Sequence, residues 1–331
     1  MNYELCMENN TKSTILAYIK EKGAVAPKDL KSITNIGPRA IFKQLKNLIN
    51  KGILAKTGQP PKVYYRLAES DIPSPSPAIP LQNTDILEQN YLIITPQGQA
   101  KTGVDGFLYW CKKNQLDPNK AFEDYKNTLA KYNRFKKDGL IDGLPKFKQT
   151  FPTVYLDEIY YLDFYSLERF GKTKLGWLLL YAKQTQNLEL MKQIYELIKE
   201  PIQKIISAKK IKAVGFIPPT IARQLQLQKE LEKMLNLGLP KINLIKIANQ
   251  IAVPQKSLNK LEDRIENASH TIMIDDKNIY DNILLIDDAV GSGATLNETA
   301  RQIKNKKLCS GKIIGLALTG SFKGFDIINE V

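Results

Sequence analysis

Residues 282–299, NILLIDDAVGSGATLNET, form the stretch that most constrains this chain. Four apolar residues at 283–286 predict a buried parallel strand, and two adjacent carboxylates, Asp287 and Asp288, follow it directly. A loop of small residues comes next and ends at Thr295, which has a glutamate three residues later, the spacing of a capping box. We therefore expect a strand, an acid pair, a glycine loop and a helix start in direct succession.

The chemistry of this stretch suits a phosphorylated sugar. A glycine loop at a helix start presents backbone N–H groups and the positive end of the helix dipole to an anion. The loop lacks the Gly-Lys-Ser/Thr ending of a Walker A motif and the third glycine of a dinucleotide-binding fingerprint. Because carboxylates accept hydrogen bonds from vicinal hydroxyls, we expect ribose on Asp287 and Asp288. The 5-phosphate is expected on Ala289, Val290, Gly291, Ser292, Gly293, Ala294 and Thr295.

The same residues resemble the phosphoribosyl-pyrophosphate (PRPP) motif of the type I phosphoribosyltransferases, which has four apolar residues, two acids, two apolar residues and a small Ser/Thr/Gly loop ending in Thr. One departure is Gly291, where the family more often carries Thr, Ser or Ala. The resemblance implies an α/β fold with helices on both faces of a parallel sheet. It also implies magnesium carried by PRPP, with no direct protein ligand. The alternative is an ordinary strand-to-helix turn that holds two acids.

Length and composition limit the remaining classes. A chain of 331 residues predicts two or three domains. No apolar run approaches the roughly 18 residues of a membrane span, and the first ten residues lack the basic and apolar regions of a signal peptide, so we expect a cytoplasmic protein without a membrane partner. Cys6, Cys111, Cys309 and His270 show no metal-ligand spacing, which argues against structural zinc and against a Cys-His nucleophile.

Positive charge is concentrated at the N-terminus. Residues 1–70 hold twelve Lys or Arg and five Asp or Glu, an excess of seven out of a net charge of +14, and such a small basic unit favours nucleic acid as a partner. The apolar pattern, the prolines and the glycines predict three helices followed by a hairpin. These elements are expected over 11–22, 27–33, 38–51, 53–56 and 63–67.

This N-terminal stretch resembles the winged helix-turn-helix units of bacterial and archaeal regulators. On the third helix Ile41, Phe42, Leu45, Leu48 and Ile49 share an apolar face, opposite a polar stripe. In that family the third helix enters the major groove of duplex DNA. The resemblance implies DNA contacts from Arg39, Lys43, Gln44, Lys46, Asn47, Lys56 and Lys62. Winged helices that bind protein or dimerise are the alternative.

The rest of the chain divides into three parts. Alternating Pro and Ser in 71–84 predict an extended linker, and 85–150 is expected to be a mostly helical middle region in which aromatic residues pack a core. From 151 to 331 strands and helices alternate, which predicts a parallel sheet with helices on both faces. A strand over 211–217 leads to a Pro-Pro-Thr turn, expected at the edge of the sheet where ligands bind.

Residues 155–331 also resemble the ComF-type competence-protein branch of the phosphoribosyltransferases. The matching residues are Pro218, Pro219, Arg223, Gln228, Gln255, Leu258, Arg264 and Asn267. The spacing from Arg223 to Gln228 and the spacing from Leu258 to Arg264 are each one residue longer than in that branch, and its zinc-binding cysteines are absent. The resemblance implies that a lid over 253–268 and the proline turn hold pyrophosphate. The expected pyrophosphate-side residues are Pro219, Thr220, Arg223, Lys256, Lys260 and Arg264.

Two functions remain open at this point. One is a phosphoribosyltransferase that joins PRPP to a nitrogenous acceptor, with the N-terminal unit bound to DNA. The other is a regulator in which the transferase fold senses PRPP, by analogy with the purine-operon repressors, which combine the same two modules. A homodimer is compatible with both.

Overall fold

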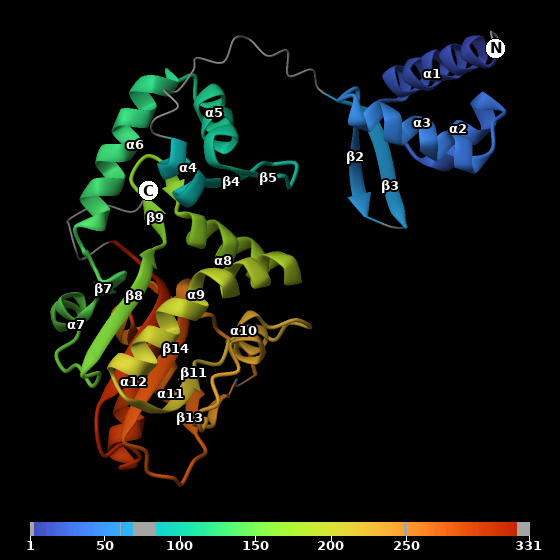
Figure 1. Cartoon of the computed structure of the whole chain (residues 1–331). Helices are drawn as coiled ribbons and strands as arrows, with labels where there is room; N and C mark the ends of the chain where they lie inside the picture. Colours follow the sequence, from blue (N-terminus) through green and yellow to red (C-terminus); the bar gives the residue numbers. More distant parts are fainter. Residues whose placement is uncertain (1–2, 60, 69–83, 248–249, 323–331) are drawn as a thin grey trace. The chain divides into compact units, whose positions relative to one another are not determined.

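A computed structural model describes residues 3–59, 61–68, 84–247 and 250–322 (Figure 1). The chain divides into two compact units, Met1–Pro77 and Ala78–Val331. The predicted linker, 71–84, lies outside the described residues except for Thr84. Among the described residues, none of the helices is both long enough and apolar enough to cross a membrane.

The N-terminal unit contains three helices and a small antiparallel sheet. Asn35, with a φ of 52°, and Gly37 turn the chain between the second and third helices, and Pro38 occupies the first turn of the third, where its missing N–H costs nothing. The sheet has the order β1-β3-β2. The elements are α1 (Tyr3–Lys22), β1 (Ala24–Val25), α2 (Pro27–Thr34), α3 (Pro38–Asn50), β2 (Leu54–Gln59) and β3 (Lys62–Leu67).

The core of this unit is formed by one face of each helix. Ile41, Leu45 and Leu48 of α3 are buried together with Ile15, Ile19 and Leu30 of α1 and α2. Phe42 was expected on the same apolar face, but 53% of it is exposed. That expectation was wrong because Phe42 follows Ile41 by one position, a rotation of about 100° around the helix axis.

The second unit begins with a helical region and continues as alternating strands and helices. Its first half contains α4 (Thr84–Asn90), β4 (Leu92–Ile94), β5 (Ala100–Thr102), α5 (Gly103–Lys113), α6 (Pro118–Asn133), β6 (Lys136–Lys137), β7 (Leu140–Asp142), α7 (Leu144–Thr150), β8 (Glu158–Phe164), β9 (Ser166–Leu167) and β10 (Gly171–Lys172). Its second half contains α8 (Lys174–Thr185), α9 (Leu188–Ala208), β11 (Ile211–Phe216), α10 (Leu227–Leu235), β12 (Leu244–Lys246), the 3-10 turn η2 (Gln255–Ser257), α11 (Leu261–Thr271), β13 (Ile272–Ile274), β14 (Asn282–Val290), α12 (Ala294–Asn305) and β15 (Ile313–Gly320).

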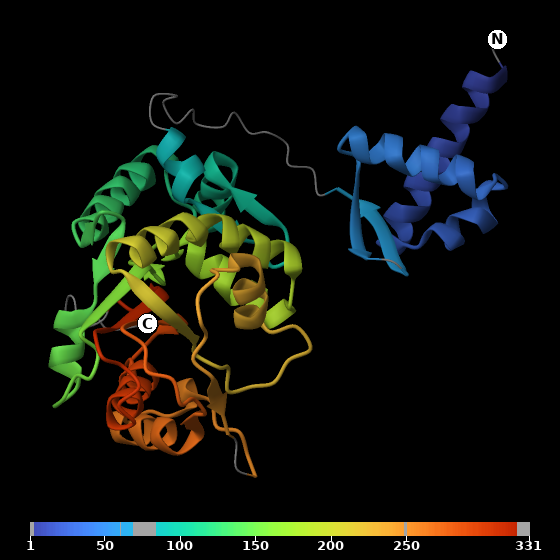
Figure 2. The same cartoon turned by 60° about the horizontal axis from the view of Figure 1, so that its bottom comes forward.

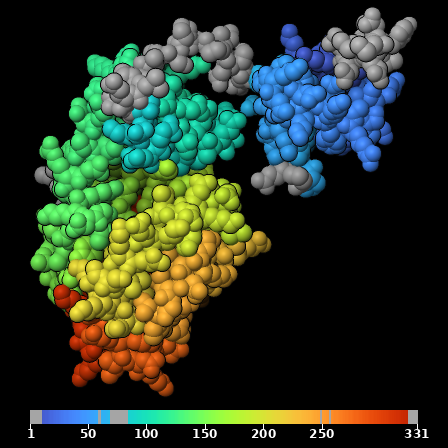
Figure 3. Space-filling model, in the orientation of Figure 1, coloured from blue at the N-terminus to red at the C-terminus, as the bar shows by residue number. Residues whose placement is uncertain are grey.

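A six-stranded sheet forms the centre of this unit, in the order β11-β14-β15-β8-β7-β6. The first four strands are parallel, as expected, whereas β7 and β6 are antiparallel at one edge. These two short strands come from the middle region that was expected to be mostly helical. They tie that region to the sheet, and the space-filling view shows the two parts as one continuous body (Figure 3).

Helices cover both faces of the sheet. Leu284 and Ile286 of β14 pack with buried residues of α8, α9 and α10, whereas Ile283 and Leu285 pack on the opposite face with Leu296 and other residues of α12. This alternation follows from the two-residue period of a strand. Helices α8 and α9 lie next to each other on their side of the sheet (Figure 2). The second unit is therefore a three-layer α/β structure with a mostly parallel sheet.

Candidate functional site

The predicted acid pair lies within β14, which continues to Val290 and does not end at Ile286 as the sequence suggested. The strand is longer because β15 is buried over its whole length and pairs with it as far as Gly320. On the other side, the backbone N–H of Ile217 donates to the carbonyl of Ile286 at 2.9 Å. The proline turn after β11 therefore begins beside the acid pair, at the carboxyl edge of the sheet.

Asp288 forms an ion pair with a residue that the sequence analysis did not identify. The Nζ atom of Lys183, in the last turn of α8, donates to Oδ2 of Asp288 at 2.6 Å, and 36% of the lysine side chain and 11% of the aspartate side chain are exposed. Asp288 faces α8 because it continues the alternation of Leu284 and Ile286 along the strand. Burial opposes the charge of Lys183, but the two carboxylates outweigh it and raise the pKa of Lys183.

Asp287 accepts hydrogen bonds from the backbone of the next residue and from α10. Its Oδ1 atom accepts from the backbone N–H of Asp288 at 2.8 Å and from Nε2 of Gln228 at 3.4 Å. Burial and the neighbouring charge of Asp288 hold the pKa of Asp287 well above its usual range, while Lys183 and Lys246 act in the opposite direction. The two acids therefore differ, since only Asp288 is directly paired with a cation.

Lys246 brings a second lysine to this edge of the sheet. It lies on β12, where its Nζ atom donates to Oγ1 of Thr271 at 2.6 Å. Burial lowers the pKa of Lys246 to about 8, and the charge of Asp287 raises it in part. Arg223, from the loop after β11, is near enough to Lys183 to lower its pKa. Lys183 and Lys246 thus act on the two carboxylates, and Arg223 lies near Lys183.

The glycine loop is shaped by a close contact with α7. Gly293 has a φ of 89°, and a β-carbon at this position would overlap the ring of Phe147. Helix α12 starts at Ala294, one residue earlier than expected. Among the described residues, the backbone N–H groups of Thr295 and Leu296 have no protein acceptor, as is usual for the first turn of a helix.

The expected capping box at the start of α12 is absent. The N-cap residue is Gly293, which has no side chain to accept a hydrogen bond. Glu298 is instead buried and receives two hydrogen bonds from Arg301, at 2.7 and 2.6 Å. The expectation was wrong because an arginine three residues later offers a bidentate partner that a backbone N–H cannot match.

Two cations lie beside the glycine loop. The ammonium of Lys146, a buried residue of α7, donates to the carbonyl of Gly291 at 2.9 Å and to that of Ser321 at 3.2 Å. Nη1 of Arg264 lies 3.9 Å from the place that a β-carbon on Gly291 would occupy. The loop therefore combines backbone N–H groups with positive charge, as a phosphate requires.

The residues that resemble the ComF-type branch contact one another in the predicted lid. Nε2 of Gln255 donates to the carbonyl of Arg264 at 3.0 Å and to Oδ1 of Asn267 at 3.1 Å. Nε of Arg264 donates to the carbonyl of Leu258 at 2.8 Å. These bonds fix the start of α11 and direct Arg264 towards the glycine loop.

The remaining pyrophosphate-side residues are less closely connected to the acids. Pro219 and Thr220 are half-buried in the turn after β11, and the N–H of Leu225 in the same loop donates to Oε1 of Gln186 at 2.8 Å. Lys260 is exposed at the N-cap of α11 and, within the described residues, has no polar contact with the acid pair. The side chain of Lys256 lies outside the described residues.

The predicted DNA-binding residues all lie on the surface of the N-terminal unit. One group lies on α3, which also carries the exposed Phe42, and the other lies on the hairpin strands β2 and β3. Arg39, Lys43, Lys46, Asn47, Lys56 and Lys62 are exposed, and Gln44 is half-buried.

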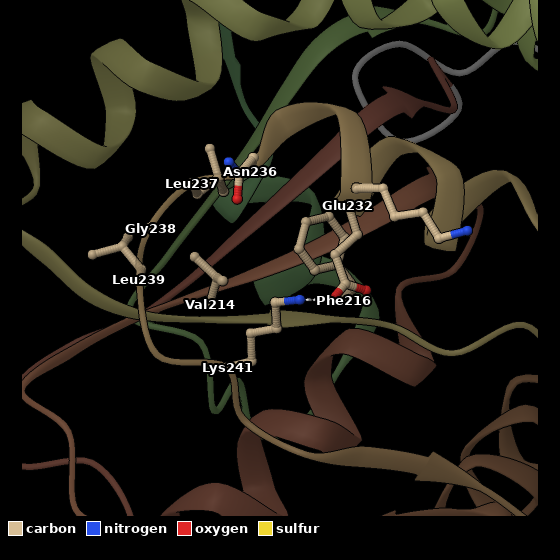
Figure 4. Close-up of a pocket in the computed structure, with 9 residues that line it drawn as sticks. Val214, Phe216, Glu232, Asn236, Leu237, Gly238, Leu239 and Lys241 are labelled. Atoms are coloured by element: carbon tan, nitrogen blue, oxygen red, sulfur yellow. Dashed lines mark ion pairs between the residues drawn. The ribbon is translucent and has the colours of Figure 1, made fainter.

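Two surface cavities lie away from the acid pair. The first, of about 390 Å³, is lined by Val214 and Phe216 of β11 and by the chain from α10 onwards, including an ion pair of 2.5 Å between Lys241 and Glu232 (Figure 4). The second, of about 370 Å³, lies between α11, α12 and residues 151–155. Neither contains Asp287 or Asp288, so neither is the predicted sugar site.

Sequence reasoning missed the lysines that complete the site. Lys183 and Lys146 come from helices more than a hundred residues away, and no local pattern distinguishes them from surface lysines. Lys246 was partly predictable, because it lies within the mostly apolar segment INLIKI. A charged side chain that is buried there needs a partner or a ligand.

No protein-family model matches this chain, and a comparison with curated proteins gives no match. Solved structures of adenine phosphoribosyltransferase show a partial similarity. The enzyme from Leishmania tarentolae superposes with a TM-score of 0.24 at 12% identity, over 44% of this chain and 76% of that chain. The enzyme from Leishmania donovani gives a TM-score of 0.25 at 14% identity, over 46% of this chain and 75% of that chain.

Proposed function

We propose that the second unit binds magnesium PRPP and transfers its ribose 5-phosphate to a nitrogenous acceptor. The observation that carries the proposal is one continuous segment in which Asp287 and Asp288 precede a glycine loop and the first turn of α12, with the N–H groups of Thr295 and Leu296. Vicinal hydroxyls suit the acids, and a 5-phosphate suits the loop beside Lys146. Arg264, expected on the pyrophosphate side, also lies near Gly291 of this loop. The sequence pattern of the type I phosphoribosyltransferases, ComF-type branch included, supports the same assignment.

The residues present fit a magnesium ion carried by the ligand. Asp288 is already bonded to Lys183, and the described residues contain no group of three metal-type ligands. When bound, the ion would neutralise part of the pyrophosphate charge. We assign Arg223, in the loop after β11, to the same leaving group, together with the backbone N–H groups that follow Pro219.

The chain's own residues would act mainly by positioning. Bond cleavage at the anomeric carbon of PRPP leaves positive charge on the ribose ring and negative charge on pyrophosphate. The acid pair would orient the ring through its hydroxyls, and the loop would hold the 5-phosphate. The cationic residues on the predicted pyrophosphate side would favour departure of pyrophosphate. Such electrostatic complementarity lowers the barrier more than it strengthens substrate binding.

The test of transfer activity is pyrophosphate release from PRPP in the presence of magnesium and a panel of nucleobases. We expect release with one acceptor and none without protein. Asp287→Asn/Asp288→Asn should abolish it, whereas Asp281→Asn, an exposed acid just before the same strand, should not change it. Equal release by the double variant and the wild type would remove the acid pair from the reaction.

A second candidate function is a PRPP-responsive regulator of transcription. It is favoured by the N-terminal unit, which has three helices and a β2–β3 hairpin, the elements that the winged helix-turn-helix resemblance implies, and whose exposed basic residues on α3 and the hairpin suit duplex DNA. In this case PRPP binding without pyrophosphate release is expected. A PRPP-dependent change in DNA affinity would separate the regulator from the enzyme.

A further inference from the structure

The acid pair already contains a cation that belongs to the protein. The Nζ atom of Lys183 lies 2.6 Å from Oδ2 of Asp288, whose side chain is only 11% exposed. Asp287 contributes to the same field and raises the pKa of Lys183 further. A buried carboxylate without such a partner would be strongly unfavourable. Lys183 therefore supplies the charge compensation that adjacent carboxylates elsewhere obtain from metal ions.

The position of Lys183 is fixed by the helix that carries it. Helix α8 is capped by Thr173, whose hydroxyl accepts a hydrogen bond from the N–H of Gly176 at 3.0 Å, and it packs Leu178, Leu179 and Ala182 into the core. Lys183 follows in the last turn, where the negative end of the helix dipole also favours a cation. A flexible surface lysine would lose more side-chain entropy in forming the same pair.

The ion pair engages only one of the two side-chain oxygens of Asp288. Lys183 contacts Oδ2, and none of the described side chains donates to Oδ1. A carboxylate oxygen accepts up to two hydrogen bonds, so Asp288 can keep its lysine and still accept from a sugar hydroxyl. Asp287 accepts a hydrogen bond from Gln228, whose amide is buried and whose Oε1 has no partner among the described residues. The pair is thus oriented before a ligand arrives.

We propose that Lys183 is the resident counter-ion of Asp287 and Asp288, and that it positions Asp288 to bind the hydroxyls of a ribose phosphate without a metal ion at the carboxylates. This inference rests on the proposed function for its ligand, a phosphorylated ribose with free vicinal hydroxyls. The role of Lys183 as counter-ion of the acids does not depend on the proposed function. Lys183 is a positioning residue, since it acts through Asp288.

The first test concerns the acids alone and needs no sugar. Titration of the full chain with Mn²⁺, followed by calorimetry or by electron paramagnetic resonance, should show no site at the acid pair of the wild type. Lys183→Gln removes the counter-ion and should create one Mn²⁺ site, which Asp288→Asn in the same chain should abolish. Lys183→Arg should bind as little Mn²⁺ as the wild type. Absence of a new site in Lys183→Gln, with the fold intact by circular dichroism, would overturn the proposal.

The second test uses ribose 5-phosphate in calorimetry, with EDTA or with millimolar Mg²⁺. The wild type should bind equally well in both. Lys183→Gln should bind at least about tenfold more weakly in EDTA, the effect of losing a charged partner, and should recover part of this loss in Mg²⁺. A control variant, Lys192→Gln, removes an exposed lysine of α9 and should match the wild type.

The outcomes of the two tests separate the two proposals. Equal binding of ribose 5-phosphate by the wild type and Lys183→Gln in EDTA would overturn the role of Lys183, and so would a loss that Mg²⁺ does not alter. If the wild type binds neither ribose 5-phosphate nor PRPP, the proposed function fails. The Mn²⁺ result then still decides whether Lys183 is the counter-ion of the acids.

Discussion

Phe147 lies directly against Gly293, so closely that a β-carbon on this glycine would overlap the phenylalanine ring. The glycine also has a φ of 89°, which side chains with a β-carbon rarely adopt. Gly291, two residues earlier, differs on both points, because the nearest atom to an added β-carbon is 3.9 Å away and its φ is not positive. The loop therefore contains one glycine that is required and one that is replaceable.

We predict that Gly293→Ala destabilises the second unit by about 1–3 kcal/mol, the usual cost of strain at a special φ, and weakens binding of PRPP. Gly291→Ala is the matched control and should alter neither. The measurements are urea unfolding and calorimetry with PRPP. Equal stability of the Gly293→Ala and Gly291→Ala variants would contradict the prediction, because it would show that the Phe147 ring moves aside without a cost in stability.

Lys246 predicts a dependence of stability on alkaline pH. Burial lowers its pKa to about 8 in the folded protein, against an ordinary value of 10.5. Between these values the unfolded chain binds more protons than the folded chain, so the free energy of unfolding should rise with pH in this window. Lys246→Met should be more stable than the wild type at pH 7 and should lack this rise.

The comparison for Lys246 is made by urea unfolding between pH 7 and pH 10.5. Lys229→Met, which replaces an exposed lysine of α10, serves as the control and should retain the rise. If the free energy of unfolding of Lys246→Met rises with pH as much as that of the wild type, a group other than Lys246 causes the rise.

The N-terminal unit is predicted to bind duplex DNA mainly through phosphate contacts. Each lysine that neutralises a phosphate contributes about 0.9 to the slope of log affinity against log salt, so Lys43→Ala should lower the magnitude of this slope by about one unit. Lys20→Ala, an exposed lysine of α1, should leave it unchanged. A slope near zero in the wild type would instead favour a protein partner for this unit.

Coupling between the units distinguishes a sensor from an enzyme with a separate DNA anchor. A regulator requires that saturating PRPP change DNA affinity, by a factor of about 5–150 in typical allosteric proteins, and that DNA change PRPP affinity by the same factor. Fluorescence anisotropy on labelled duplex DNA measures the first factor, and calorimetry measures the second. Unchanged DNA affinity at saturating PRPP would remove the sensor proposal.

The contiguous part of the site was predictable because neighbouring residues determine it. Strand β14, the acid pair and α12 occur in the predicted order, since apolar runs and glycine loops act over a few residues. The details depend on partners elsewhere. Helix α12 starts at Ala294 and lacks the capping box because Gly293 turns the chain and Arg301 binds Glu298.

The cations around the site could not be predicted from local pattern. Lys183 reaches Asp288 only because α8 packs on the face of the sheet towards which Asp288 points, and Lys146 reaches Gly291 from α7. Both relationships arise from tertiary packing. The antiparallel strands β6 and β7 were missed for another reason, since two or three residues are too few to show a two-residue period.

The most direct test of the central claim is calorimetry with magnesium PRPP on the wild type, on Asp287→Asn/Asp288→Asn and on Asp281→Asn. We predict binding to the wild type and to Asp281→Asn with equal affinity. The double variant should lose a few kcal/mol of binding free energy, because hydrogen bonds to charged groups contribute about 1.5–3 kcal/mol each. Equal affinity in all three proteins would contradict the assignment of the ribose to the acid pair.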